Sequence, residues 1–576
     1  MGRLFPYSTR QSGLLLIFLV SHTLAQVLII PPTNPSQLAS KSVVNNFISL
    51  SIAIHFFQDY TRAGTDGEAT NTFSKNLLSS LKESTSIAPE IRIGGTSADR
   101  TTFVPSQESA ILQVSGANGI PLNVTLNQKW FQQCFDEANF PSGTKFIFDL
   151  PLMRNDSQAL NNTIQGAEWA LQAIGSDRLE AFEVGNEEDL YVGQSVVPPT
   201  WTVVNYAARW RIFSSAVSER VLIPFGLDLT KKWFQGLAFS GLGANPAWTT
   251  QTAFNANVNE NDRLKTVSLH NYPAGAAPWV NLGNTFMNHS AIVANLSQVK
   301  DDIAFLASSP STEDIAFNLG ETNIDFTNLG MDQFEGVLGS ALWTIDYILY
   351  AASLSINRIY LHQGTTFGYA AWQPIATNTS QPKVRSPWYG LKFAAETIGS
   401  HQGSIQIIPL DIIASNNITD SFSTITSDSN SDTTSSNITQ PYTHVQILTS
   451  EKISAYAIYE SSSLARIALI NFNEWNNTTP YARPNAVFRI TLPHPTGNTT
   501  GSNSNSVSMR TLTAPGGASA DNELTFGGIM WNYTTQGLPQ QVESVPGTVV
   551  VERSTKDGSI TVEVGASEAV LIAVNS

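Results

Sequence analysis

Two glutamates in this sequence follow apolar runs in the way that reactive carboxylates follow the strands of a barrel. Glu187 stands in FEVGNEEDLY directly after Asn186, and Glu321 stands in AFNLGETN directly after Gly320. In a (β/α)8 barrel the reacting groups sit at the C-terminal ends of the strands, where the loops open to a ligand. A pair of carboxyl groups there can cleave a glycosidic bond, through a covalent intermediate at a gap of about 5 Å and with inversion at a wider gap. The sequence leaves both geometries open.

Five further side chains could complete a sugar-binding site. His270 and Tyr272 in SLHNYP end an apolar run, where a donor could reach a carboxylate and a phenol could meet an acidic substrate. Gln363, Tyr369 and Trp372 in HQGTTFGYAAWQP could form the floor and wall of a subsite, because a pyranose has an apolar face on which aromatic rings stack. Core packing is the competing interpretation for the strand-end residues and for Trp372.

A barrel is needed to bring these residues together, and the chain has the pattern of one. Over residues 47–398, apolar runs alternate with longer amphipathic stretches, which is typical of repeated βα units around a parallel sheet. The pattern predicts an α/β fold, a (β/α)8 TIM barrel with Glu187 after the fourth strand and Glu321 after the seventh. A helix over NTFSKNLLSSLKEST has Asn71 or Thr72 as its predicted N-cap. The predicted strands are ISLSIAI, EIRIGG, KFIFDL, LEAFEVGNE, ERVLIPFG, LKTVSLHNY, IAFNLGETN and INRIYLHQG.

The remainder of the chain predicts a second domain. Residues 399–576 hold short alternating segments separated by Gly, Pro, Asn and Ser, which favours an antiparallel β-sandwich. Residues 26–46 are expected to add an N-terminal strand, VLIIPP, and a linker to this domain. Ser/Thr/Asn-rich segments near 414–440 and 495–506 predict mobile, glycosylated loops, since they bury too little apolar surface to order themselves.

The N-terminus predicts export. Residues 1–25 combine Arg3 and Arg10 with the apolar run GLLLIFLV and a small-residue cleavage site, which is the layout of a signal peptide. A membrane anchor is the alternative, but the run is far short of the roughly 20 residues that a spanning helix needs. We therefore expect a secreted, extracellular protein with no membrane association after cleavage. Sequons for N-glycosylation agree with this and stand at Asn123, Asn155, Asn161, Asn288, Asn295, Asn378, Asn417, Asn437, Asn476, Asn498 and Asn532.

Composition excludes several classes of function. The formal net charge is −15 and the sequence has no Lys/Arg cluster, so nucleic-acid binding lacks its electrostatic driving force. Cys134 is the single cysteine, which rules out an intrachain disulfide and favours a small buried side chain over a nucleophile. No His/Asp cluster has metal-ligand spacing in the sequence, so we expect neither a metal nor a cofactor. The expected partner is a carbohydrate, bound by a monomer.

The motifs VGNEED and LGETN resemble the acid/base and nucleophile motifs of glycoside hydrolase clan A, and of family 79 most closely. The similarity to the fungal β-glucuronidase branch extends over nearly the whole barrel, through IRIGGTSAD, SLHNYP, RIYLHQGTTFGYAAWQP and WYGLKFAAETIG. The resemblance implies that Asn186 binds the sugar 2-hydroxyl, that Glu187 protonates the leaving oxygen and that Glu321 attacks the anomeric carbon. Glu183 and Glu188 are rivals that rank below Glu187, since they flank the motif position.

Some positions depart from the family pattern. Relatives carry an acidic residue in a Ser-Ile-Glu context where this chain has Ala53, and many have Arg where it has Gly368. The loop after Glu321, NIDFTNLGM, differs from the Ser/Gly-rich version typical of the family. If the residues at these positions contact the sugar, the substrate differs from simple glucuronides or the activity is weak.

The resemblance implies a retaining, exo-acting β-glucuronidase that removes glucuronate or 4-O-methylglucuronate from glycan side chains. Two alternatives stay open. An endo-acting, heparanase-like or hyaluronidase-like enzyme would need an open cleft lined with Lys and Arg. A secreted carbohydrate-binding protein with weak activity or none would explain the departures from the family pattern.

Overall fold

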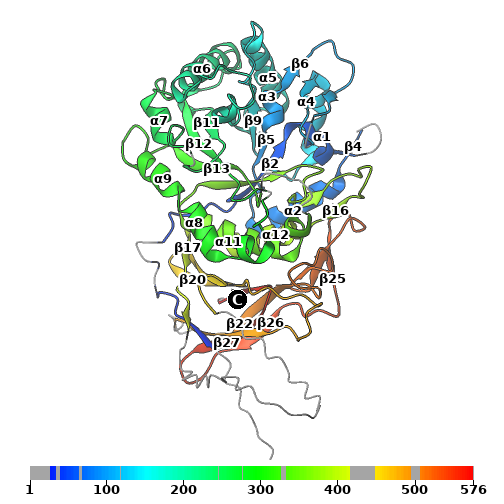
Figure 1. Ribbon diagram of the computed structural model, residues 1–576, viewed down its shortest axis with the longest axis vertical. Coiled ribbons are helices and arrows are strands. Elements are labelled where there is room, and N and C mark those ends of the chain that lie inside the picture. Colours follow the sequence, from blue (N-terminus) through cyan, green and yellow to red (C-terminus); the bar gives the residue numbers. More distant parts are fainter. Residues whose placement is uncertain are drawn as a thin grey trace, which may run out of the picture.

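The computed structural model of the protein describes residues 26–574 except 34, 36–38, 64–67, 117–118, 244, 276, 326–331, 415–447 and 494–505. The predicted leader lies outside the described residues, as do almost all of the two polar segments. A barrel with surrounding helices and a β domain packed against one side of it make up the described chain (Figure 1). None of the helices in the described ranges combines the length and the apolar character needed to cross a membrane.

Eight parallel strands close into the barrel, which confirms the predicted fold class. Each strand pairs in parallel with its neighbours, and β9 closes the ring by pairing with β10. The strands are almost wholly buried, because helices cover their outer faces and side chains fill the interior. They are β2 (Ile48–Ala53), β5 (Ile91–Gly94), β9 (Phe146–Leu150), β10 (Leu179–Val184), β11 (Phe234–Phe239), β12 (Leu264–Asn271), β13 (Ala316–Thr322) and β14 (Arg358–Gln363).

The fifth strand differs from its prediction. The run ERVLIPFG is not a strand, since Ser218–Leu222 form a π-helical turn that continues α6. Its apolar residues divide between two faces, with Val221 and Leu222 buried and Ile223 54% exposed. The fifth strand of the barrel is β11, FQGLAF, in which a buried glutamine interrupts the apolar pattern. Gln235 is tolerated inside because its amide donates to the Glu183 carboxylate and accepts from Thr266 and Asn318.

Helices lie around the strands and begin where the sequence supplies caps. Asn71 caps α2, because its side-chain oxygen accepts from the backbone N–H of Ser74 at 3.0 Å. The helices are α1 (Ile54–Thr61), α2 (Thr72–Thr85), α3 (Thr96–Asp99), α4 (Gln128–Cys134), α5 (Ala159–Ile174), α6 (Val203–Val217), α7 (Thr250–Asn255), α8 (His289–Leu296), α9 (Val299–Ala307), α10 (Asp332–Glu335), α11 (Leu338–Ser353) and α12 (Ser386–Ile398). Short strands in the connections are β3 (Arg62–Ala63), β4 (Ala69–Thr70), β6 (Thr101–Phe103), β7 (Ile111–Val114), β8 (Asn123–Leu126), β15 (Trp372–Gln373) and β16 (Lys383–Val384).

The β domain is a sandwich of two sheets. The smaller sheet runs β18 (Ile413–Ala414), β1 (Gln26–Ile29), β21 (Asn485–Thr491) and β27 (Ser559–Gly565), and β1 pairs in parallel with β21. The inner faces of the two sheets share an apolar core that includes Val27, Phe488, Val562 and Ile572. The larger sheet contains β17 (Ile405–Pro409), β19 (Ile453–Glu460), β20 (Ser463–Asn471), β28 (Glu568–Ala573), β22 (Ser506–Thr513), β23 (Thr525–Phe526), β24 (Ile529–Trp531), β25 (Pro539–Gln541) and β26 (Val549–Glu552).

Helix α11 lies between the barrel and this larger sheet. It is buried over nearly its whole length, which explains why its sequence is apolar on all sides. One buried carboxylate interrupts it: Asp346 accepts a hydrogen bond from Tyr456 of β19 at 2.6 Å and contacts His289 Nδ1 at 2.7 Å. The three side chains therefore join the two domains through a buried polar contact.

Removing the phenol of this contact should weaken the domain junction. We expect Tyr456→Phe to lower the free energy of unfolding by about 1–3 kcal/mol, because it withdraws a donor from the fully buried Asp346 carboxylate. Denaturant unfolding followed by fluorescence and circular dichroism measures the change. Tyr533→Phe is the matched control, since Tyr533 is 41% exposed. Equal stability of the two variants would contradict the prediction.

Candidate active site

The backbone at the end of β10 turns sharply and brings Glu187 to the barrel mouth. Gly185 has φ 92°, and a side chain there would come within 2.4 Å of Glu188 Oε1, so only glycine fits the turn. Glu187 itself is left-handed at φ 52°. Its N–H donates to the carbonyl of Ala238 in β11 at 2.9 Å, which fixes the turn against the next strand. The strained conformation is held by its surroundings, as is common at functional positions.

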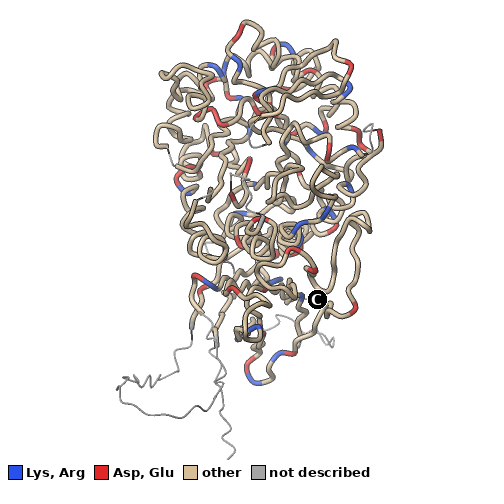
Figure 2. The backbone as a smooth tube through the Cα atoms, turned by 45° about the vertical axis from the view of Figure 1, so that its right-hand side comes forward, with Lys and Arg blue, Asp and Glu red and all other residues tan. Residues whose placement is uncertain are grey.

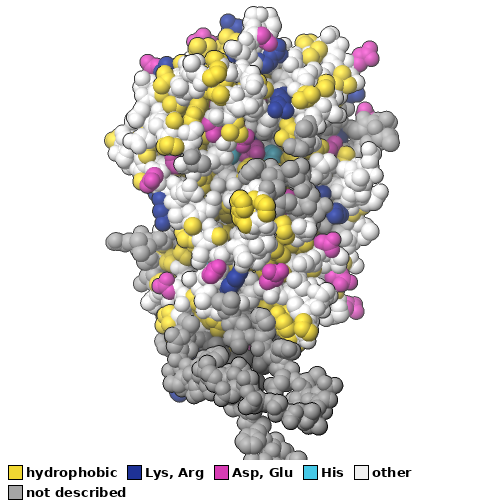
Figure 3. All heavy atoms as spheres, viewed as in Figure 1, with side chains coloured by type: hydrophobic (Ala, Val, Ile, Leu, Met, Phe, Trp, Pro, Cys, Tyr) yellow, Lys and Arg dark blue, Asp and Glu magenta, His cyan; other side chains and the backbone are white. Residues whose placement is uncertain are grey.

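A cavity of about 640 Å³ opens at this end of the barrel, and both predicted glutamates line it. Figure 3 shows acidic and histidine side chains together in a hollow on this face of the molecule. The size is that of a small-ligand site. Other lining residues are Ala53, His55, Gly95, Thr96, Ser97, Ile120, Leu190, Ser240, Gly241, Leu242, Asn271, Tyr272, Asn295, Gln298, His362, Phe367 and Tyr369.

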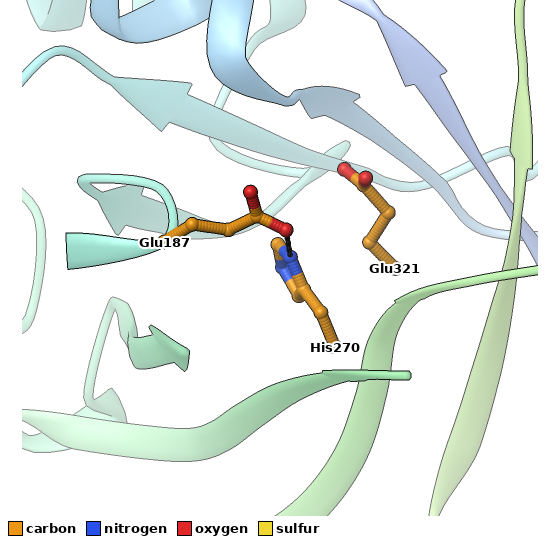
Figure 4. Close-up of side chains that lie close together, drawn as sticks. All are labelled: Glu187, His270 and Glu321. Atoms are coloured by element: carbon orange, nitrogen blue, oxygen red, sulfur yellow. Dashed lines mark hydrogen bonds and ion pairs between the residues drawn. The ribbon is translucent and has the colours of Figure 1, made fainter. Parts of the chain in front are cut away.

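The carboxyl groups of Glu187 and Glu321 face each other across the cavity (Figure 4). One oxygen of each, together with a ring nitrogen of His270, lie within 4.8 Å of one another. His270 Nδ1 contacts Glu187 Oε1 at 3.1 Å from the neighbouring strand β12. This separation falls in the short class of carboxylate pairs, which leaves no room for a water molecule between a sugar and the attacking oxygen.

Glu321 is surrounded by donors and positive charge. Arg92 Nη1 donates to Oε2 at 2.8 Å, and the Tyr272 hydroxyl donates to Oε1 at 2.8 Å. Burial alone would raise the pKa of the Glu321 carboxyl. The histidines His362 and His270, and then Arg92 and Tyr272, outweigh burial and lower its pKa to about 2. Glu321 is therefore ionised throughout the ordinary pH range.

Glu187 is shifted in the opposite direction. Burial is the largest cause and raises the pKa of the Glu187 carboxyl, and the negative charge of Glu321 raises it further. The contact with His270 opposes this without reversing it. Two carboxyl groups in one cavity thus have separated proton affinities, which is how an acid and a nucleophile are distinguished in such sites.

Arg92, on β5, organises the floor of the site. Its side chain is fully buried and donates to Glu183 at 2.6 Å, to Asn186 Oδ1 at 2.9 Å and to Ser51 at 3.0 Å, in addition to Glu321. The negative charges around it raise the pKa of Arg92 despite burial. Sequence reasoning missed this residue. The signal for it was a charged side chain inside the otherwise apolar run EIRIGG.

The two rival glutamates do not line the cavity. Glu183 lies beneath it as the ion-pair partner of Arg92. Glu188 is fully buried without a hydrogen-bond partner for either oxygen in the described chain, and burial raises its pKa well above the ordinary value. Asn186 is also buried below the cavity lining, at 2% exposure, with its side-chain oxygen committed to Arg92.

Two of the predicted subsite residues are elsewhere, which corrects the sequence interpretation. The side-chain amide of Gln363 forms its hydrogen bonds with the backbone. Its oxygen accepts from the Ala371 N–H at 2.8 Å, and its nitrogen donates to nearby backbone carbonyls. Trp372 is fully buried in the core, where its indole N–H donates to Ser74 at 2.9 Å and its ring packs against Trp388. Both side chains have full sets of internal partners, so they contribute to the fold beneath the site.

Tyr272 and Tyr369 line the cavity with the two glutamates, along with several residues that were not foreseen. His270 is not among the lining residues and reaches the site through its contact with Glu187. Tyr272 and Tyr369 lie near each other, with ring centroids 6.3 Å apart. His362 enters from β14, and its Nδ1 contacts Ser51 at 3.0 Å. Ala53, one of the positions where a departure from the family pattern is expected from the sequence, lines the cavity at the end of β2. Residues 326–331 of the loop after Glu321 lie outside the described part of the chain.

A (β/α)8 barrel with two glutamates of unlike proton affinity facing each other at the C-terminal ends of its strands defines a glycoside hydrolase. Comparison with known proteins specifies the class further. Residues 455–571 match the model of the glycosyl hydrolase family 79 C-terminal beta domain. A beta-glucuronidase of Neurospora crassa is 30% identical over 93% of this chain and 94% of the relative. A beta-glucuronidase of Aspergillus niger is 28% identical over 93% and 92%.

Among solved structures, the 4-O-alpha-L-rhamnosyl-beta-D-glucuronidase of Fusarium oxysporum shares the fold with a TM-score of 0.70. It is 21% identical, and the match covers 95% of this chain and all of that one. The chain belongs to glycoside hydrolase family 79.

The side chains of Glu187, His270 and Glu321 are also close enough to surround a cation, a grouping that the sequence did not suggest. We nevertheless predict no metal requirement, because Arg92 and Tyr272 already occupy both Glu321 oxygens. Dialysis against EDTA should leave the hydrolysis rate unchanged within about 20%. A loss of rate that Zn²⁺ or Mn²⁺ restores would contradict this expectation.

Proposed function

We propose that this enzyme is a secreted, exo-acting β-glucuronidase that works by double displacement, with Glu321 as nucleophile and Glu187 as acid/base. The observation that carries the proposal is the pair of carboxyl oxygens within 4.8 Å, one acid with a raised and the other with a lowered pKa. The glucuronidase names of the two fungal relatives support the choice of sugar. The predicted leader and sequons support secretion.

In the first step a Glu321 oxygen attacks the anomeric carbon while the bond to the leaving oxygen breaks. Glu187 gives its proton to that oxygen, and a glycosyl ester forms on Glu321. In the second step the ionised Glu187 takes a proton from water, the resulting nucleophile attacks the anomeric carbon, and Glu321 leaves as a carboxylate. The sugar is released with its original configuration.

The side chains that contact Glu187 and Glu321 are placed to support these two steps. Arg92 and Tyr272 hold Glu321 ionised and in place for attack. We propose that His270 orients the Glu187 carboxyl from its contact at 3.1 Å. Asn186 remains our candidate for the sugar 2-hydroxyl, since it directly precedes Glu187 and shares Arg92 with the nucleophile.

Charge favours an exo-acting enzyme over an endo-acting one on polyanionic chains. Among the described residues that line the cavity, none is Lys or Arg. Figure 2 shows basic residues scattered over the backbone without a single large cluster, in a chain of net charge −15. A long acidic polysaccharide would therefore meet repulsion without compensation.

Substitution of the two glutamates tests the proposal directly. We expect Glu321→Gln to lower kcat on p-nitrophenyl β-glucuronide by about 10⁴-fold or more, because a neutral amide cannot form the ester. Glu187→Gln should lower kcat by about 10²–10⁴-fold on substrates with poor leaving groups, because they need a proton from the acid. Glu260→Gln, at an exposed ion pair, is the control. Proton NMR should show the β-anomer of the sugar as the first product, and a first-formed α-anomer would exclude retention.

The pH profile should report Glu187. Since Glu187 must be protonated, kcat/KM should fall as pH rises through its raised pKa, whereas ionisation of Glu321, with a pKa of about 2, should impose no loss until near pH 2. His270 lowers the pKa of Glu187, so His270→Asn should move the basic limb to higher pH. Circular dichroism at each pH controls for unfolding. A basic limb displaced to lower pH in this variant would refute the assignment.

A further inference from the structure

Glu188 is a second carboxyl group beside the acid/base, and it lies inside the protein. It begins the short helix Glu188–Leu190 directly after Glu187 and is fully buried. Among the residues that the structure describes, none forms a hydrogen bond with either of its carboxyl oxygens. The proposed mechanism makes no use of it. A buried polar group without a partner costs stability, so this placement requires a physical explanation.

Asp99, close to Glu188, shows what a buried carboxylate needs around it. It accepts hydrogen bonds from the Tyr191 hydroxyl at 2.6 Å and from three backbone N–H groups at 2.8 to 3.3 Å. Burial raises the pKa of Asp99 to about 6, and these donors prevent a larger rise. Glu188 has no donor from another described residue, so burial raises its pKa well above the ordinary value. Glu188 therefore keeps its proton in neutral solution.

The charges around Glu188 act in the same direction as burial. The negative charges of nearby carboxyl groups raise its pKa further. Two arginines reach this region, but Arg92 pairs with Glu183 and Glu321, and Arg209 interacts with Asp99 and Tyr191. An ionised Glu188 would thus add a buried negative charge without a cation of its own. The titratable groups that face Glu188 are the carboxyl groups of Asp99, Glu183 and Asp189 and the phenols of Tyr191 and Tyr206.

The Glu188 carboxyl packs against the turn that aims Glu187. A side chain on Gly185 would come within 2.4 Å of Glu188 Oε1, so no space separates the carboxyl from the turn. The backbone of the same segment is held from outside, because the Glu188 carbonyl accepts from Trp201 Nε1 at 3.0 Å. Water can reach an ionised Glu188 only if this packing opens, and the opening would move Gly185 and Glu187.

We propose that Glu188 is a positioning residue that must stay protonated, and that its ionisation opens the turn which places Glu187. The inference rests on the proposed function of Glu187 and extends it to a pH limit built into the fold. The site is assembled in acidic and neutral solution and is released in alkaline solution. Glu188 does not line the cavity, so it acts only through the turn.

Thermal unfolding at two pH values tests whether Glu188 holds a proton. A glutamate in the unfolded chain loses its proton above about pH 4.3, whereas Glu188 in the folded protein keeps it to higher pH. Folding of the wild type therefore takes up a proton in this interval, and its stability falls as pH rises. Glu188→Gln has no proton to lose. We expect its Tm, relative to that of the wild type, to rise by about 2–5 °C between pH 4.5 and pH 7.5.

Glu313→Gln, at an exposed position, is the matched control for this measurement. Its Tm should differ from that of the wild type by the same amount at both pH values. If the Tm difference between Glu188→Gln and the wild type is also the same at both pH values, the proposal is overturned.

The dependence of the rate on the leaving group tests whether Glu188 places Glu187. Methyl β-glucuronide needs a proton from the acid, whereas p-nitrophenyl β-glucuronide has a leaving group that departs with little help. At pH 5 we expect Glu188→Ala to lower kcat/KM for the methyl glycoside at least about 10-fold more than for the aryl glycoside, because the turn loses its packing. Glu188→Gln fills the same space and should keep the wild-type ratio of the two rates. An equal loss on both substrates with Glu188→Ala would overturn the positioning role.

The outcomes separate this inference from the function beneath it. If the folded wild-type protein hydrolyses neither glycoside, the proposed function fails and the positioning role fails with it. If it hydrolyses both and the Tm difference of Glu188→Gln does not change with pH, the proposed function stands and the role of Glu188 is overturned. The Tm comparison decides this even if Glu188→Ala does not fold.

Discussion

The buried guanidinium of Arg92 is the group on which the arrangement of the site depends. It lies inside the barrel with no exposed surface and bonds Glu183, Asn186 and Glu321, which come from two different strands and the turn after one of them. A charge taken out of water is tolerated only with such full pairing, because removal of one partner leaves the others uncompensated. Arg92 thereby ties the end of β10 to the end of β13 and sets the position of both candidate catalytic groups.

The same network shifts the pKa values of two glutamates, Glu187 and Glu321, in opposite directions. Glu321 lies next to Arg92 and the Tyr272 hydroxyl, so its charged form is favoured. Glu187 is buried and lies next to the negative charge of Glu321, so its protonated form is favoured. The turn at Gly185 is what aims Glu187 at this place. Protonation state is thus a consequence of position within a single low-dielectric cavity.

The β domain contributes to the site at a distance, by covering the helices that support the barrel. Helix α11 follows β13, which carries Glu321, and its apolar surface is buried between the barrel and the larger sheet. The buried contact of Asp346 with Tyr456 and His289 fixes this helix in register with β19. Packing of this kind holds the strand ends rigid, which a pair of carboxyl groups at a fixed separation requires.

The amino-acid sequence predicted the fold class, the two glutamates that line the cavity and seven of the eight barrel strands. It could do so because apolar runs of strand length and the motifs after them are local features. It failed for β11, where Gln235 is buried through partners on other strands, and it placed Gln363 and Trp372 in the site although their partners lie in the core. It also gave no sign of what Arg92 binds. Only the tertiary structure decided that the carboxyl groups of Glu187 and Glu321 meet in one cavity, how far apart they lie and the opposite directions of their pKa shifts. The physical reason is that each of these depends on groups far apart along the chain, whose proximity is set by closure of the barrel and not by any neighbour in sequence.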